Sequence, residues 1–149
     1  MGLIHSVRPM TGRDIGEVVR LEKLSFSESW PESMIRSGLD SRLDTYFVYE
    51  AHGQILGYSV IRVLGDEGEI QRIAVAPRFR RLGIARKLME AMVTFSRLRG
   101  VRAITLEVRV SNEGARKLYD SYGFKKEALR RRYYRTTTED AIIIWDWNI

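Results

Sequence analysis

The segment Arg80-Arg81-Leu82-Gly83-Ile84-Ala85 stands between a strand-like run that closes at Pro77 and the start of a long amphipathic helix. Backbone N–H groups at a helix N-terminus have no intrahelical partner and lie at the positive end of the helix dipole. Small residues at Gly83 and Ala85 allow a phosphate to approach this backbone, and arginines on both sides add positive charge. The spacing matches neither the Rossmann fingerprint nor a P-loop. This segment alone favours equally a diphosphate cradle and an ordinary basic helix start.

Strand-like and helix-like patterns alternate on both sides of this segment. Runs of β-branched and aromatic residues predict strands, and apolar residues at helical spacing predict helices. Thr11 and Asp14 resemble a capping box before the first helix, and His52-Gly53 indicates a hairpin turn. The order predicts an α/β protein with a mixed sheet and helices on its faces. The expected strands are 4–8, 45–51, 54–63, 69–75, 103–109, 125–129 and 141–147, and the expected helices begin near residues 15, 31, 84 and 112.

The composition fits one compact domain over residues 1–149, with 44% hydrophobic and 30% charged residues. The chain has no cysteine, which excludes disulfides, thiolate metal sites and a cysteine nucleophile. His5 and His52 lack any ligand spacing, so no metal site is expected. No apolar run is long enough to cross a bilayer and no secretory signal is visible, so we expect a cytoplasmic location. The formal net charge of +6 favours an anionic partner, which nucleic acid, a phosphorylated cofactor and the ribosome all satisfy.

Two blocks of the sequence resemble a known family. Ile73-Ala74-Val75, then Pro77 and the 80–85 loop, resemble the acetyl-CoA-binding motif of the GNAT N-acetyltransferases. A second block is similar to the N-terminal protein acetyltransferases, both the ribosomal-protein-alanine and the archaeal type. The resemblance covers nearly the whole chain and implies the GNAT fold, with a mixed, mostly antiparallel central sheet of about seven strands and helices on both faces. The second block consists of Leu106-Glu107-Val108-Arg109, Ser111-Asn112, Ala115, Leu118-Tyr119 and Gly123-Phe124.

The resemblance implies acetyl-CoA as the cosubstrate and no metal. In that family the strand before the loop splays from its neighbour, and its exposed backbone pairs with the pantetheine arm. The residues implied as acetyl-CoA contacts are Ile73, Ala74, Val75, Arg80, Arg81, Leu82, Gly83, Ile84, Ala85, Arg86 and Asn112.

A carboxylate at a strand end, facing a helix that presents a tyrosine, forms a plausible base and acid pair. The resemblance assigns these roles to Glu107, which takes a proton from the amine directly or through water, and to Tyr119, which donates one to the departing CoA sulfur. Glu69 on the neighbouring strand is a rival base. The alternatives without function are a solvated strand charge for Glu107 and a core position for Tyr119.

Four aromatic residues align with the loops that flank the peptide groove in the resembled family. They are either a clamp on the first residues of a substrate or hydrophobic lids. The basic run 130–132 is favoured as a solvated strand edge over a contact with ribosomal RNA. The four aromatic residues are Phe26, Trp30, Tyr133 and Tyr134.

The leading hypothesis is a protein N-α-acetyltransferase that acts on the N-terminus of a ribosomal or nascent protein by direct transfer in a ternary complex. A protein α-amino group has a pKa near roughly 8, against roughly 10.4 for lysine, so a weak base suffices to activate it. The expected partner is a protein or peptide N-terminus, with ribosome association left open. No membrane and no sequence-specific nucleic acid is expected. The rivals are a broad-specificity N-terminal acetyltransferase of the archaeal type, a polyamine acetyltransferase, and a non-catalytic basic module that binds RNA or the ribosome.

Overall fold

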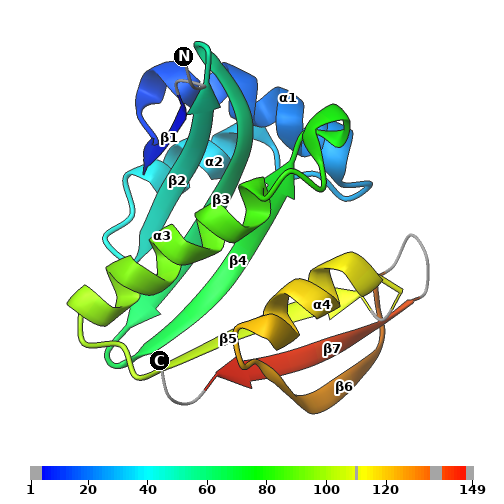
Figure 1. The fold of residues 1–149 in the computed structure, drawn as a ribbon. Coiled ribbons are helices and arrows are strands. Elements are labelled where there is room, and N and C mark those ends of the chain that lie inside the picture. Colours follow the sequence, from blue (N-terminus) through cyan, green and yellow to red (C-terminus); the bar gives the residue numbers. More distant parts are fainter. Residues whose placement is uncertain (1–4, 110, 135–138, 147–149) are drawn as a thin grey trace. The chain divides into compact units, whose positions relative to one another are not determined.

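The computed structural model describes the backbone of residues 5–109, 111–134 and 139–146, and side chains as far as Lys125 (Figure 1). The chain divides into two compact units. Unit 1 comprises Met1–Arg62 and Gln71–Phe95, and unit 2 comprises Val63–Ile70 and Ser96–Ile149. Hydrogen bonding joins seven strands in the order β1-β2-β3-β4-β5-β7-β6. The α/β class with a mixed sheet is therefore confirmed, whereas the single domain over 1–149 stays a prediction.

Unit 1 is built on antiparallel strands with a tight hairpin between β2 and β3. His52 and Gly53 form its turn with φ values of 51° and 75°, as a two-residue turn that matches the strand twist requires. The strands are β1 (His5–Pro9), β2 (Asp44–Ala51), β3 (Gln54–Leu64) and β4 (Glu67–Val75), with the last two strands reaching into unit 2. The helices are η1 (Gly12–Asp14), α1 (Ile15–Ser25), α2 (Glu32–Leu39), η2 (Pro77–Phe79) and α3 (Ile84–Leu98).

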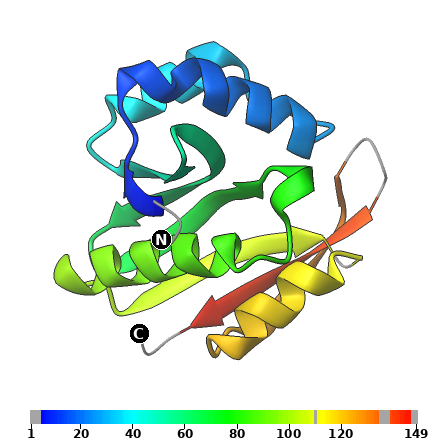
Figure 2. The same ribbon diagram turned by 45° about the horizontal axis from the view of Figure 1, so that its top comes forward.

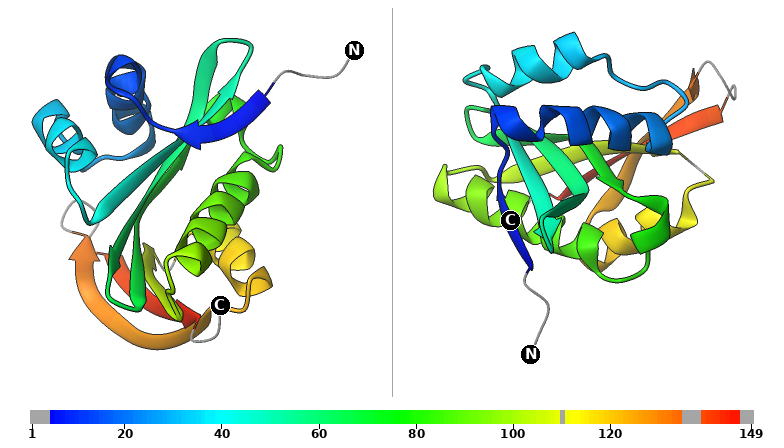
Figure 3. Two further views of the ribbon diagram at one scale, coloured as in Figure 1. Left: turned by 90° about the vertical axis from the view of Figure 1, so that its left-hand side faces the viewer. Right: turned by 90° about the horizontal axis from the view of Figure 1, so that it is seen from above.

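The helices of unit 1 cover both faces of its strands. Figures 2 and 3 show α1 and α2 side by side on one face and α3 on the other. Apolar residues of α1 recur at helical spacing, so one stripe of the helix is buried. The core under α1 and α2 contains Met10, Ile15, Val18, Leu21, Ile35, Tyr46, Val48, Ile55, Tyr58, Val60 and Ala74.

Unit 2 contains the remaining strands and one helix, namely β5 (Ala103–Arg109), α4 (Glu113–Ser121), β6 (Lys125–Tyr134) and β7 (Glu139–Asp146). β5 runs parallel to the start of β4 and antiparallel to β7, which also pairs with β6. The helix α4 runs alongside β5 and β7 (Figures 1 and 2).

Several predicted boundaries need correction. The capping box of Thr11 and Asp14 is confirmed, but it caps the short helix η1, which leads into α1; Thr11 N–H donates to the Asp14 carboxylate at 2.8 Å. Pro9 is the last residue of β1 rather than its stop, because an edge strand tolerates a residue without an N–H. β6 extends to Tyr134, well beyond the predicted end at 129. In the part of the chain that the structure describes, no helix has the length and apolarity that a bilayer span needs.

Candidate functional site

The loop between β4 and α3 is anchored at the end of β4. Ala76 N–H donates to the Leu56 carbonyl on β3 at 2.8 Å, and Phe79 N–H donates back to the Ala76 carbonyl at 2.8 Å. The Arg80 Nε donates to the Val75 carbonyl at 3.1 Å. Arg80 is therefore partly used to tie the loop to the strand that precedes it, a role the sequence did not indicate.

Two residues of this loop have left-handed backbone conformations. Arg81 has φ 65° and Gly83 has φ 84°. A non-glycine residue in this region costs about 1–2 kcal/mol, so the conformation of Arg81 has to be held by its surroundings. No described atom lies within 4 Å of a Cβ built on Gly83, so space is open beside its backbone. The Lys87 N–H donates to the Gly83 carbonyl at 3.2 Å, which places Gly83 directly before the first turn of α3.

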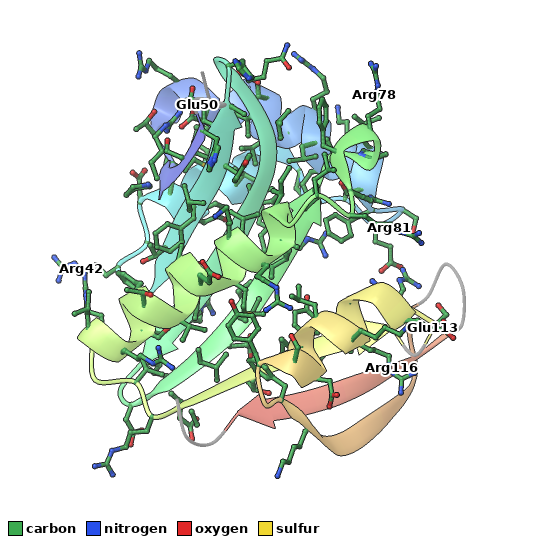
Figure 4. The ribbon with its side chains drawn as sticks, in the orientation of Figure 1. Arg42, Glu50, Arg78, Arg81, Glu113 and Arg116 are labelled. Atoms are coloured by element: carbon green, nitrogen blue, oxygen red, sulfur yellow. The ribbon has the colours of Figure 1, made fainter. Side chains whose placement is uncertain are left out.

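The charges around this helix start have the sign that suits an anion. The first turn of α3, which the structure describes in full, contains no acidic residue, although a carboxylate there would interact favourably with the helix dipole. Arg78 and Arg81 are exposed in the preceding segment (Figure 4), and no ion pair to either is found among the described residues. An incoming diphosphate would supply the missing negative charge, so the residues fit the diphosphate of acetyl-CoA.

Gly57 on β3 allows α3 to lie close to the end of β4. A Cβ at this position would meet the Ala74 carbonyl oxygen at 3.0 Å, Ile84 Cγ2 at 3.1 Å and Leu88 Cδ1 at 3.2 Å. These contacts are tighter than ordinary packing, so a side chain at Gly57 would push the helix away from the strands. The glycine thereby brings the helix N-terminus and residues 73–75 together.

In unit 2, the buried residues of β5 alternate as the sequence predicts. Leu106 and Val108 are buried, whereas Glu107 is half-buried on the opposite face. Glu69 on β4 is exposed and pairs in register with Thr105, so Glu69 and Glu107 lie on the same face of the sheet. Their positions differ by two residues along the strand direction, or roughly 6.6 Å. Both carboxylates therefore remain candidates for the base.

Tyr119 lies in the last turns of α4 and is 8% exposed. Its ring packs edge to face against that of Phe124, with the ring centres 6.0 Å apart, and Phe124 N–H donates to the Tyr119 carbonyl at 3.1 Å. Gly123, with φ 95°, provides the left-handed residue that closes the helix. Asn112 precedes the helix as its N-cap and accepts a hydrogen bond from Ala115 N–H at 3.1 Å. The predicted helix start at Asn112 is thus its cap, and this side chain already has a structural role.

The sequence reasoning missed a buried ion pair beneath the loop between α1 and α2. Glu22 on α1 is completely buried, and its carboxylate accepts two hydrogen bonds from Arg72 on β4, at 2.9 and 3.0 Å. The sequence did carry a signal, because Glu22 continues the helical stripe of Ile15 and Val18 and therefore falls on the apolar face of α1. An acidic residue on such a face needs a partner.

The structure groups the predicted site residues by unit. Unit 1 contains Phe26, Trp30 and residues 73–86, whereas unit 2 contains Glu107, Asn112 and Tyr119. Tyr133 and Tyr134, predicted in a groove loop, are the last two residues of strand β6, and their side chains lie outside the described part. Among the described residues, no group of three His, Cys, Asp or Glu side chains is placed to hold a metal ion.

The chain is similar to known proteins over nearly its whole length. The model of the Acetyltransferase (GNAT) family matches residues 15–124. Ribosomal protein bS18-alanine N-acetyltransferase of Escherichia coli (strain K12) is 32% identical over 143 residues, covering 95% of this chain and 96% of that protein. The crystal structure of the E. coli enzyme superposes with a TM-score of 0.88 at 31% identity, over 95% of this chain and 92% of that one.

Two further structures share the fold over nearly their whole length. Ard1 from Thermoplasma volcanium has a TM-score of 0.89 at 28% identity, with 97% of this chain and 98% of that chain covered. A chain of the NatC complex, solved bound to Gag peptide and CoA, has a TM-score of 0.83 at 25% identity, covering 95% of this chain and 96% of that chain.

Proposed function

Because this chain belongs to the acetyltransferase (GNAT) family, we propose that it acetylates the N-terminal α-amino group of a ribosomal or nascent protein. Membership makes the chain an acetyl-CoA-dependent N-acetyltransferase. The structural observation that supports the use of acetyl-CoA is the start of α3, where left-handed Arg81 and Gly83 precede a helix turn without acidic residues. Residues 73–75, the 80–86 segment and Asn112 are the proposed acetyl-CoA contacts.

The proposed chemistry requires one base and one acid. Acetyl-CoA supplies the acetyl group as a thioester. Glu107 would take a proton from the acceptor ammonium, directly or through water, and Tyr119 would donate a proton to the sulfur as charge develops there. The chain contains no cysteine, so an acetyl-enzyme on a thiol is excluded, and direct transfer in a ternary complex is the proposed route.

An N-terminal acceptor is supported by the relatives and by the chemistry of the amine. The E. coli relative is named for an alanine of a ribosomal protein, and the NatC structure contains a peptide. An α-amino group with a pKa near roughly 8 is partly neutral at physiological pH, unlike a lysine. Phe26 and Trp30, with Tyr133 and Tyr134, are the proposed contacts for the first residues of the peptide. A cytoplasmic location and association with the ribosome belong to the same proposal.

The decisive test supplies labelled acetyl-CoA together with peptides that differ at residues one and two, free lysine and spermidine. Acetylation of the peptide α-amine, located by mass spectrometry, is the expected result. Acceptance of many different first residues would favour the broad archaeal type, to which Ard1 from Thermoplasma volcanium points. Acetylation of spermidine alone, or of lysine ε-amines alone, would refute the proposed acceptor.

A further inference from the structure

We propose that Arg72 is a positioning residue for the acceptor, because it holds the loop between α1 and α2 in the shape that receives the peptide. The inference rests on the proposed function insofar as this loop contacts the peptide. Arg72 itself lies on β4, next to the 73–75 segment, and nothing in its sequence context assigns it a role. Its side chain connects with three residues of the loop and with the buried acid beneath it.

The carboxylate of Glu22 is the centre of this arrangement. Glu22 Oε1 accepts from Arg72 Nε at 2.9 Å, and Oε2 accepts from Arg72 Nη2 at 3.0 Å. The Trp30 backbone N–H donates to Oε2 at 2.6 Å, and the Tyr58 hydroxyl donates to Oε1. Burial, together with the Glu22 carboxylate, raises the pKa of Tyr58 well above its ordinary value, so Tyr58 remains a donor. One end of the loop is therefore fixed through its backbone.

The guanidinium of Arg72 holds the rest of the loop. Its central carbon lies 3.8 Å from the centre of the Phe26 ring and 4.6 Å from that of Trp30. Its Nη2 also donates to the Glu28 carbonyl at 3.0 Å. A planar guanidinium stacks on aromatic rings while its edge forms a fork of hydrogen bonds. The two rings proposed to contact the peptide thus share a single cationic partner.

The loop and the acetyl-CoA cradle, which consists of residues 73–75 and 80–86, are supported from different sides of the unit 1 strands. The loop follows α1, which covers one face of the strands, whereas α3 covers the other face (Figure 3). Gly57 packs against Ile84 and Leu88 of α3 and so belongs to the support of the cradle. A change at Arg72 should therefore affect peptide binding more than acetyl-CoA binding.

Ordering a flexible loop on binding costs affinity, and a loop already held in the bound shape avoids that cost. Arg72→Gln removes the charge, the stacking on the two rings and the two-bond contact with Glu22, whereas Arg72→Lys keeps the charge alone. Arg72→Gln should therefore raise the KM for the peptide roughly tenfold, the effect of ordering one or two side chains on binding. Arg72→Lys should restore part of this loss, and the KM for acetyl-CoA should change less than about twofold in both variants.

The matched control is Arg62→Gln. Arg62 on β3 also forms a two-bond pair with a carboxylate, at 2.7 and 3.1 Å, but this carboxylate is that of Asp44 on β2 rather than one of α1 or its loop. This variant should leave both KM values unchanged. Removing an arginine–carboxylate pair is then not sufficient to produce the effect.

Hydrogen exchange of the full-length protein tests the same idea without relying on activity. Arg72→Gln removes the two-bond contact that holds the Glu22 carboxylate, which accepts from the Trp30 amide, so this amide should exchange roughly ten- to a hundredfold faster. Exchange in α3 should be unchanged. If Arg72→Gln does not fold, Arg72→Lys carries both measurements, with smaller shifts in the same direction.

The outcomes separate the two proposals. Faster loop exchange with a selective rise in peptide KM supports the inference. Unchanged loop exchange, or an equal rise in both KM values, overturns it. If wild type acetylates no peptide, the proposed function fails whatever the hydrogen exchange of the loop shows. Faster loop exchange would then show only that Arg72 holds the loop, and the inference that it positions a peptide would be overturned as well.

Discussion

In unit 1 the carboxylate of Glu22 is fully buried and accepts four hydrogen bonds. In unit 2, by contrast, the Glu107 side chain on β5 is half-buried, and the exposed Glu69 lies on the same face of the neighbouring strand β4. The donors to Glu22 come from Tyr58 on β3, Arg72 on β4 and the backbone of Trp30, so this carboxylate joins two strands and the loop to α1. Glu22 therefore organises a loop, whereas the proton transfer that we propose is assigned to the more accessible carboxylates of unit 2.

This difference predicts how substitutions act on the kinetics. Changes at the proposed binding residues of unit 1 should alter the KM for one of the two substrates, because its loops and helix start are proposed to bind them. Changes at the candidate acid and base in unit 2 should alter kcat, because these groups act when charge develops. A unit 1 variant that lowers kcat alone would break the division.

The largest effect is expected for Glu107→Gln, which keeps the shape and removes the basic group. We expect kcat to fall by roughly a hundred- to ten-thousandfold, the range for loss of a general base. Raising the pH should recover part of the loss, because the free amine then needs no base. Steady-state kinetics at several pH values, with Glu69→Gln beside it, measures this.

The Glu69 variant is the matched control, since Glu69 lies on the same face of the sheet. If Glu69→Gln is the crippled enzyme, the base has been assigned to the wrong carboxylate. If neither variant loses more than a few-fold, no single carboxylate acts as base. Catalysis would then depend on positioning an already neutral amine.

A smaller effect, on the KM for acetyl-CoA, is expected for Gly83→Ala. The added methyl group meets no described atom, but it projects where a diphosphate would approach and strains a residue at φ 84°. A rise of roughly tenfold in this KM corresponds to about 1.4 kcal/mol of lost binding. The KM for the peptide should stay nearly constant.

Gly100→Ala is the control for backbone strain. Gly100 follows the other end of α3, has φ 79°, and also has no described atom near its Cβ position. Both variants should lose about 1 kcal/mol of stability from the left-handed alanine, measured by urea unfolding. A similar rise in acetyl-CoA KM in both variants would show that the cradle assignment is wrong and that strain alone is responsible.

The features that the sequence predicted depend on neighbouring residues. The alternation of β5, the hairpin at His52-Gly53 and the glycine before α3 each follow from a pattern within a few positions. The helical pattern of α1 indicates that Glu22 is buried, but its partner Arg72 lies 50 positions away, so no local pattern identifies that partner. The run 130–132 does lie in an edge strand, as its charge indicated, but the end of β6 at Tyr134 escaped prediction because charged residues at a sheet edge do not follow an apolar alternation.

The smallest effect on catalysis, and a clear one on stability, is expected for Asp14→Asn in unit 1. Arg8 donates to the Asp14 carboxylate at 2.8 and 2.9 Å, and this pair lowers the pKa of Asp14 from its ordinary value of 3.8 to about 2. The pair lies before the first residue of α1, whereas the loop proposed to bind the peptide follows the last residue of α1, and the 80–86 segment is further along the chain. Neither KM nor kcat should therefore change at pH 7. The free energy of unfolding should fall by about 2 kcal/mol.

The pH dependence identifies this pair as the cause. Because the pKa of Asp14 is lower in the folded state, its stabilisation is fully present above pH 4 and is lost as pH falls through about 2. Urea unfolding at pH 7, 5, 4 and 3 should show the gap between wild type and Asp14→Asn narrowing only below pH 4. Glu32→Gln, which removes the exposed Arg36–Glu32 pair, should show almost no gap at any pH. If the stability gap between wild type and Asp14→Asn stays constant down to pH 3, the loss is due to the hydrogen bond from Thr11 N–H rather than to the charge of Asp14. A change in kcat would contradict the assignment of catalysis to residues of unit 2.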